Sequence, residues 1–267
     1  MNRYKKTFSK LKEKKVKALV PFVVAGDPNH NTSLEIVKTI INAGADILEL
    51  GFTFSEPIAD GPTIQTAGIR ALKSGSNTDK NFSFIREIRK FNNKIPIGIL
   101  IYANLIYQRG IDNFYKDSKQ SGIDSVLVAD LPIEEAEPYI KAARKNKIDT
   151  IFIVSPLTDN KRLEKIAKKT KGFVYVVSRL GVTGVRLDIQ HGTLELLKRI
   201  RPKTRLPICV GFGISKPEHV SQICKAGADG AIVGSAIVKI IEENLNNKEI
   251  MLKKIGNYIV GMKNAAK

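Results

Sequence analysis

The chain has 267 residues, of which 43% are hydrophobic, and it carries a formal net charge of +18 with a pI near 9.8. An α/β barrel needs about 250 residues, so the length allows one large domain or two small ones, with enough apolar content for a sizeable core. The charge keeps a nucleic-acid-binding protein as an alternative, but Lys, Ile and Asn are abundant along the whole chain and no nucleic-acid-binding motif is recognisable.

The composition also indicates a compartment. Cys209 and Cys224 are too far apart for a CxxC site, and two thiols in a chain of this length are typical of a reducing environment. The N-terminus does not resemble a secretory signal, and the longest apolar run, 18–26, is far shorter than the ~20 residues that span a bilayer. We therefore expect a cytoplasmic protein that does not associate with membranes.

Residues 1–17 are strongly basic, with eight Lys or Arg and one Glu. Tyr4, Phe8 and Leu11 recur at helical spacing, which predicts an amphipathic helix that lays one face on a core. A nucleic-acid arm or a transit peptide is the alternative, because the polar face is basic.

From residue 18 onward, short apolar runs alternate with polar stretches of helical periodicity. Eight near-continuous apolar runs separated by helices predict a parallel sheet covered by helices, and eight units in this length favour a (β/α)₈ TIM barrel over an open sheet. No linker divides the chain, so we expect a single domain over 1–267. The predicted strands are Ala18–Val24, Asp46–Leu50, Pro96–Ile101, Ser125–Ala129, Thr150–Val154, Phe173–Val177, Leu206–Val210 and Gly230–Val233.

Several of the helical stretches end at a glycine suited to the left-handed residue that closes a helix. These glycines are Gly44, Gly75, Gly122, Gly172 and Gly227.

Two connections are longer than the others. After the second run, the chain passes through the loop 52–62 and an extra helix, Thr63–Ser74, before the helix expected near Asn81–Phe91. After Val177, a glycine-containing stretch precedes the helix Thr193–Ile200. Both connections follow the C-terminal ends of strands, where barrel enzymes hold their catalytic residues, so they are candidate lids.

Two carboxylates lie on the first of these connections. The run 46–50 is cut off by Gly51, which is typical of a buried strand, and side-chain alternation places Glu49 on the face of Ile47. Loss of water there raises the pKa of a carboxyl toward neutrality. Asp60 follows eleven residues later on the loop that leaves the same strand end. Two carboxylates in unlike environments commonly divide acid and base roles.

Each carboxylate also has a simpler interpretation. Glu49 could be satisfied by a buried Lys, Arg or backbone donor. Asp60 directly precedes Gly61-Pro62-Thr63, and Asp at such a place is often only a helix cap. The pair is a stronger indication of function than either residue.

The last two strands end in glycine-rich stretches, 210–215 and 232–236, and the loops after strands seven and eight of a barrel recurrently bind phosphate. Thr183-Gly184 could supply further donors. The alternative is that these glycines only serve tight turns. His30, His191 and His219 stand apart, so we infer no metal site, and no dinucleotide fingerprint is present.

The motifs of the chain resemble, in order and over nearly its whole length, those of the alpha subunit of tryptophan synthase. The matching motifs are Val20-Pro21-Phe22-Val23, Gly26-Asp27-Pro28, Ala43-Gly44-Ala45-Asp46, Leu48-Glu49-Leu50-Gly51, Phe54-Ser55, Ala59-Asp60-Gly61-Pro62-Thr63-Ile64-Gln65, Tyr102-Ala103-Asn104, Asp124-Ser125-Val126-Leu127-Val128-Ala129-Asp130, Ser178-Arg179, Gly181-Val182-Thr183-Gly184, Gly211-Phe212-Gly213-Ile214-Ser215 and Gly234-Ser235-Ala236-Ile237-Val238.

The resemblance implies a lyase that cleaves indole-3-glycerol phosphate to indole and glyceraldehyde 3-phosphate without a cofactor. It implies that Glu49 is the general acid/base that protonates the indole ring carbon, and that Asp60 holds the indole N–H. It also implies an α2β2 heterotetramer with a beta subunit that carries pyridoxal phosphate. The implied substrate-binding residues are Phe22, Leu100, Tyr102, Leu127 and Tyr175 in or supporting the indole pocket, Gly184, Gly213, Gly234 and Ser235 at the phosphate, Thr183, which would close the sixth loop over Asp60, and Phe212.

The chain departs from the family at two positions of the loop 53–57. The family's loop usually reads Pro-Phe-Ser-Asp-Pro, and here Thr53 and Glu56 replace the Pro and the Asp. Those positions face the beta subunit in the family, so the departures bear on loop closure and coupling more than on chemistry. The nearest enzyme alternative is another phosphate-binding barrel of the same pathway, which would favour a catalytic Lys–Glu or Cys–Asp arrangement.

Overall fold

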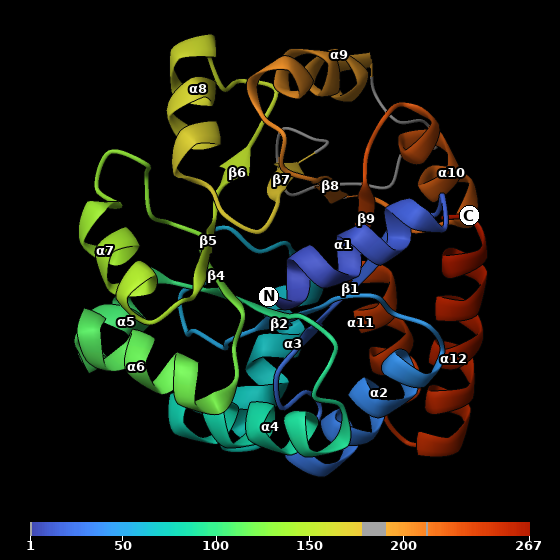
Figure 1. Cartoon of the computed structure of the whole chain (residues 1–267). Coiled ribbons are helices and arrows are strands. Elements are labelled where there is room, and N and C mark those ends of the chain that lie inside the picture. Colours follow the sequence, from blue (N-terminus) through green and yellow to red (C-terminus); the bar gives the residue numbers. More distant parts are fainter. Residues whose placement is uncertain (1, 178–190, 212) are drawn as a thin grey trace.

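The computed structural model describes residues 2–177, 191–211 and 213–267, and its centre is a parallel sheet that curls into a barrel (Figure 1). Every strand pair of this sheet is parallel, because a crossover connection returns the chain to the same end between paired strands. The strands are β1 (Ala18–Val24), β2 (Leu48–Gly51), β3 (Ile97–Ile101), β4 (Ser125–Val128), β5 (Asp149–Ile151), β6 (Ile153–Val154), β7 (Val174–Val177), β8 (Ile208–Gly211) and β9 (Gly230–Val233).

The order of the strands shows how the barrel closes. It runs β5-β4-β3-β2-β1-β9-β8-β7-β6, so β5 and β6 are its two ends. They are consecutive pieces of one segment, separated only by Phe152, and β5 pairs with β4 while β6 pairs with β7. The strand expected over Thr150–Val154 is therefore present but divided, and the eight predicted runs form the nine strands seen in the described residues. The predicted (β/α)₈ barrel is confirmed.

Helices surround the sheet and connect its strands. Their bounds are α1 (Arg3–Glu13), α2 (His30–Asn42), α3 (Pro62–Lys73), α4 (Thr78–Phe91), α5 (Ala103–Arg109), α6 (Ile111–Ser121), α7 (Glu137–Lys145), α8 (Asn160–Lys169), α9 (His191–Ile200), η1 (Arg201–Lys203, a 3₁₀ turn), α10 (Pro217–Lys225), α11 (Ser235–Glu242) and α12 (Lys248–Asn264).

Side-chain alternation divides the core into two clusters. Leu48 and Leu50 belong to the larger cluster, which fills the space between the strands and the helices. Ile47 belongs to the second, which includes the barrel interior. Glu49 is 4% exposed and lies one residue from Leu48 and from Leu50, so it points into the barrel as predicted.

The predicted N-terminal helix is α1, which lies across the N-terminal end of the barrel (Figure 1). Tyr4 and Leu11 are buried and Phe8 packs against them, as the helical spacing predicts. The Tyr4 ring reaches Phe173 at a centroid distance of 5.6 Å, and its hydroxyl shares a hydrogen bond of 2.7 Å with Ser125 Oγ. The amphipathic face of α1 therefore closes this end of the barrel.

The glycines predicted to end helices all have positive φ angles, between +77° and +104°. Gly44, Gly75, Gly122 and Gly227 stand at or directly after the C-cap of a helix. Gly172 differs, because α8 already ends at Thr170 with an extended backbone. The extra helix expected after the second strand is α3, one residue earlier at each end than predicted.

None of the helices in the described ranges is both long and apolar enough to cross a membrane.

Candidate active site

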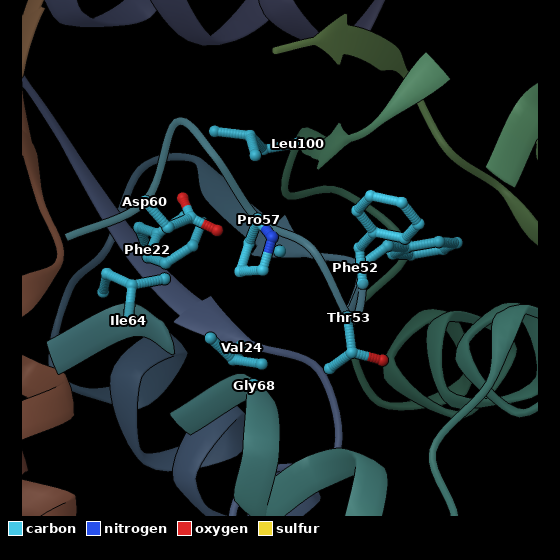
Figure 2. A pocket seen from close by; sticks show the side chains of 11 residues that line it. Phe22, Val24, Phe52, Thr53, Pro57, Asp60, Ile64, Gly68 and Leu100 are labelled. Atoms are coloured by element: carbon cyan, nitrogen blue, oxygen red, sulfur yellow. The ribbon is translucent and has the colours of Figure 1, made fainter. Parts of the chain in front are cut away.

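A pocket opens at the C-terminal ends of β1, β2 and β3 (Figure 2). These ends meet because the strands are parallel and adjacent, with Phe22 opposite Glu49 in the register of β1 and β2. The pocket has an empty volume of about 300 Å³, part of which is continuous with solvent. It is lined by Phe22, Val24, Gly51, Phe52, Thr53, Phe54, Pro57, Asp60, Ile64, Gly68 and Leu100.

Glycines at the strand ends leave room for the aromatic rings of this region. A Cβ at Gly51 would lie 2.7 Å from Cζ of Phe22, and a Cβ at Gly234 would lie 3.0 Å from its Cδ1. The Phe22 ring therefore packs between the ends of β2 and β9. In the same way a Cβ at Gly211 would lie 2.9 Å from the Tyr175 hydroxyl, so β8 makes space for the Tyr175 ring.

Glu49 lies inside the barrel beside this pocket. Burial raises the pKa of its carboxyl from 4.5 to about 8, and a hydrogen bond with Tyr175 partly offsets this rise. Its Oε2 is buried and has no hydrogen-bond partner among the described residues. Within that part of the chain no Lys or Arg pairs with Glu49, so the simpler interpretation of a buried ion pair receives no support there. A carboxyl in this setting holds a proton at neutral pH.

Asp60 lies on the loop between β2 and α3 and lines the pocket together with Phe22 and Ile64 (Figure 2). Burial raises its pKa from 3.8 to about 6, and a hydrogen bond with the Tyr102 hydroxyl partly offsets the rise. The Tyr102 oxygen also accepts a hydrogen bond from the Ala59 backbone N–H at 3.1 Å. The N-cap of α3 is Gly61, without a side-chain hydrogen bond, so Asp60 does not serve as the cap.

Tyr175 lies close enough to Glu49 and Asp60 to be affected by the charge of both carboxyls. Burial raises its pKa well above 10, and the negative charges of Glu49 and Asp60 both raise it further. The charges of both carboxyls thus raise the pKa of the same phenol, although Glu49 lies on β2 and Asp60 on the loop that follows it. With a pKa about two units higher, Glu49 keeps its proton at a pH where Asp60 has lost its own.

The other residues predicted for the ring pocket lie on the same side of the barrel. Leu100 lines the pocket, and Leu127 is its register partner on β4. Tyr102 stacks on Phe54 with a centroid distance of 5.2 Å and an interplanar angle of 29°. Sequence reasoning missed the contribution of α3, whose Ile64 and Gly68 line the pocket. Their spacing of four residues on a helix that begins just after Asp60 was the available signal.

Three of the predicted phosphate residues, Gly213, Gly234 and Ser235, lie just after the ends of β8 and β9, which pair with each other and so end at the same rim. Gly213 has a φ of +80°, which favours glycine, and Gly234 is the N-cap of α11 with Ser235 as its first residue. The N–H groups of that first turn have no partner within the helix. Thr183, Gly184 and Phe212 lie outside the described residues.

Among the described residues no group of three or more His, Cys, Asp or Glu side chains is placed to hold a metal ion. His30 instead pairs with Glu87 at 2.9 Å, and His219 Nδ1 accepts from the Ser215 N–H at 3.3 Å.

Comparisons with known proteins point to one family. The sequence model described as "Tryptophan synthase alpha chain" matches residues 8–267. The tryptophan synthase alpha chain of Methanothermobacter thermautotrophicus is 52% identical over 238 residues, which is 89% of this chain and 88% of the relative. That of Helicobacter pylori strain J99 is 48% identical over 260 residues, 97% of this chain and 99% of the relative.

Solved structures agree with the sequence comparison. The tryptophan synthase subunit alpha of Legionella pneumophila str. Paris superposes with a TM-score of 0.89 at 34% identity, covering 100% of this chain and 98% of that one. A chain of the tryptophan synthase a2b2 complex of Pyrococcus furiosus superposes with a TM-score of 0.86 at 39% identity, covering 92% and 98%.

Proposed function

The chain belongs to the tryptophan synthase alpha chain family of lyases, which acts in tryptophan biosynthesis, and from this we propose that it cleaves indole-3-glycerol phosphate into indole and glyceraldehyde 3-phosphate. The observation that carries the proposal is the pair of carboxyls of unlike pKa, Glu49 near 8 and Asp60 near 6. A retro-aldol cleavage of this substrate needs a proton on a ring carbon and a negative charge near the ring nitrogen. Protonated Glu49 would supply the proton and ionised Asp60 the charge.

In the proposed reaction the protonated Glu49 carboxyl delivers its proton to C3 of the indole ring, which leaves a positively charged indolenine. Asp60, ionised, accepts a hydrogen bond from the ring N–H and stabilises that charge. The Glu49 carboxylate then takes the proton of the neighbouring hydroxyl group. The C–C bond breaks, its electron pair restores the aromatic ring, and the aldehyde forms. Glu49 ends the cycle protonated, as it began.

The burial of Glu49 supports this role. An exposed glutamic acid near its ordinary pKa of 4.5 would be ionised at neutral pH and would have no proton to give. Buried as it is, with one oxygen free of hydrogen bonds within the described residues, it keeps the proton until about pH 8. Desolvation therefore sets its protonation state for the first step.

The pocket supports the binding of a flat ring with a phosphate tail. Phe22, Leu100, Leu127 and Tyr175 would surround the ring, with Tyr102 orienting Asp60. The backbone N–H groups around Gly213, Gly234 and Ser235 would bind the phosphate at the rim formed by β8 and β9. Thr183, Gly184 and Phe212 complete the proposed set, which binds substrate without a cofactor or metal.

We further propose that the chain works in the cytoplasm, as a single domain, in an α2β2 assembly with a tryptophan synthase beta subunit that holds pyridoxal phosphate. Three large apolar side chains on connections that follow strand C-terminal ends are exposed: Ile58 (80%), Tyr107 (73%) and Leu157 (75%). Such side chains are typical of a protein interface. The similar Pyrococcus furiosus chain comes from a tryptophan synthase a2b2 complex.

The test is an assay of indole release from indole-3-glycerol phosphate, with and without a beta subunit. We expect release in both cases, and a Glu49→Gln variant serves as the matched control for contaminating activity. If neither preparation releases indole, the proposed reaction is wrong. A salt-dependent affinity for DNA, measured on the same protein, would instead favour the nucleic-acid-binding alternative.

A further inference from the structure

Arg70 on α3 joins three segments of the chain. Its Nε and Nη2 donate to the two carboxylate oxygens of Asp27 at 2.8 and 2.9 Å, and its Nη1 reaches Glu242 at 3.3 Å. Asp27 lies in the turn after β1, and Glu242 is the last residue of α11. One guanidinium therefore bridges the β1–α2 turn, α3 and α11, a geometry that needs the planar fork of an arginine.

The Asp27 end of this bridge is deeply buried. The Asp27 side chain has no exposed surface, and that of Arg70 is 16% exposed, whereas Glu242 remains 42% exposed. A buried ion pair is a weak source of net stability, because a well-packed apolar pair is often as stable. In some proteins such a pair instead serves to fix one arrangement of the elements that it connects.

The C-cap of α3 and the residues that follow it also lie against this turn. Ser74 Oγ lies 3.3 Å from the Gly26 carbonyl oxygen, although its shorter hydrogen bond, 2.8 Å, goes to the Ala71 carbonyl. Ser76 Oγ lies 3.3 Å from the Ala25 carbonyl oxygen and 3.0 Å from Asn81 Oδ1. Small residues, Ala67 and Ala71, face the core and let α3 approach β1 closely. In Figure 1, α3 and α11 lie side by side against β1, and the three elements contact one another.

The three bridged elements carry both ends of the proposed substrate site. β1 places Phe22 and Val24 in the pocket, and α3, which begins two residues after Asp60, adds Ile64. The N-terminus of α11, beginning at Ser235, forms part of the proposed phosphate site. The bridge thus connects the last turn of α3 to the opposite, C-terminal end of α11.

We propose that Arg70 is a positioning residue that fixes the separation between the ring end and the phosphate end of the site. A substrate with a ring and a phosphate joined by a short linker binds both ends at once, and this gain holds only while the two ends stay at the matching distance. The affinity of a ligand that occupies only one end does not depend on that distance. The inference rests on the proposed function, because it uses the same site and substrate.

The experiment compares whole and partial ligands on the full chain. Arg70→Lys keeps the charge but cannot contact Asp27 through two nitrogens and Glu242 at the same time. We expect its affinities for indole alone and for glycerol 3-phosphate alone, measured by calorimetry, to stay within about twofold of wild type. We expect kcat/KM for indole-3-glycerol phosphate to fall at least about tenfold, since a displacement of about 1 Å in a site can cost 10²-fold.

Two further variants keep the test decisive. Glu242→Gln weakens only the ion pair between Arg70 and α11. Because Glu242 is partly exposed, this variant should fold even if Arg70→Lys does not. It should show a smaller fall in kcat/KM for indole-3-glycerol phosphate, again with unchanged affinities for the partial ligands. Arg162→Lys is the control. Arg162 lies on α8, away from the bridge, and forms an exposed ion pair with Glu134, so its substitution should leave kcat/KM and both partial-ligand affinities unchanged.

Two results would overturn the inference. One is a kcat/KM within twofold of wild type in both bridge variants. The other is a parallel fall of the affinities for both partial ligands, which is the result of a general loss of structure. Failure of the proposed function is distinguishable from both, because the wild-type chain would then release no indole.

Discussion

Tyr102 and Asp60 form a hydrogen bond that ties the β2–α3 loop to the end of β3. The Tyr102 hydroxyl donates to the carboxylate, and its oxygen accepts from the Ala59 N–H at 3.1 Å, so one hydroxyl contacts two consecutive residues of the loop. The bond lowers the pKa of Asp60 against the upward effect of burial. Tyr102 therefore influences both where this carboxylate lies and when it is ionised.

The first prediction concerns the pH profile of kcat/KM. Activity requires Asp60 ionised and Glu49 protonated, so the profile should be bell-shaped, with limbs near pH 6 and pH 8. Tyr102→Phe removes the bond that lowers the Asp60 pKa, so its acid limb should move to higher pH while the alkaline limb stays. An acid limb at the same pH in wild type and variant would contradict the assigned role of Tyr102.

The second prediction concerns turnover. Glu49→Gln preserves shape and hydrogen-bonding capacity but cannot deliver a proton, so turnover should fall on the order of 10²–10⁴ or more while substrate affinity stays near normal. Single-turnover indole release and the melting temperature, measured on one preparation, check this. A purely structural carboxyl would show the reverse, with lower stability and activity in proportion to the folded fraction.

The third prediction follows from linkage. The unfolded chain ionises Glu49 near its ordinary pKa of 4.5, whereas the folded chain holds the proton until about 8. The wild type should therefore lose free energy of unfolding relative to Glu49→Gln as pH rises through this window, by up to ~1.4 kcal/mol per pH unit, and no further above it. Urea unfolding of both proteins at pH 5, 7 and 9 measures the difference. A constant difference would show that Glu49 is not desolvated.

The fourth prediction separates charge from space at Gly234. Gly234→Asp should raise KM for the phosphorylated substrate by placing a like charge at the phosphate. Because a Cβ there would also lie 3.0 Å from the Phe22 ring, Gly234→Ala is the matched control for the steric part and should raise KM less. Unchanged KM in the Asp variant would remove the β8–β9 rim from the proposed site.

The fifth prediction concerns Glu56, which is exposed on the loop after β2. Glu56→Asp shortens the side chain by one methylene at a loop that should face the partner, so the Kd for a beta subunit of the family should change. The indole release of the isolated chain should not change. Equal dissociation constants for the two proteins would place Glu56 outside the interface.

The strands and the burial of Glu49 could be predicted from the sequence because they depend on local pattern. β1 and β9 have the predicted bounds, since each is a continuous apolar run with clear breaks at its ends. Glu49 faces inward because alternation along a strand leaves it no other face once Leu48 and Leu50 pack against helices.

What could not be predicted depends on contacts between distant segments. The break at Phe152 arises where β5 pairs with β4 and β6 with β7, and apolar periodicity carries no information on such a change of partner. The bond from Tyr102 to Asp60 joins residues 42 positions apart in the chain, and only the fold brings them together. The same holds for Arg70, whose side chain sequence reasoning left unassigned.

The helix α1 has a consequence for how molecules pass through the site. Its Tyr4, 1% exposed, fills the N-terminal end of the barrel beside Ser125 and Phe173, so the interior is a dead end there. In the described part of the chain, the pocket at the opposite rim is therefore the route for the substrate and both products. Products must then leave through this opening before the next substrate can bind. A partner docked over the opening would be positioned to take up indole as it leaves.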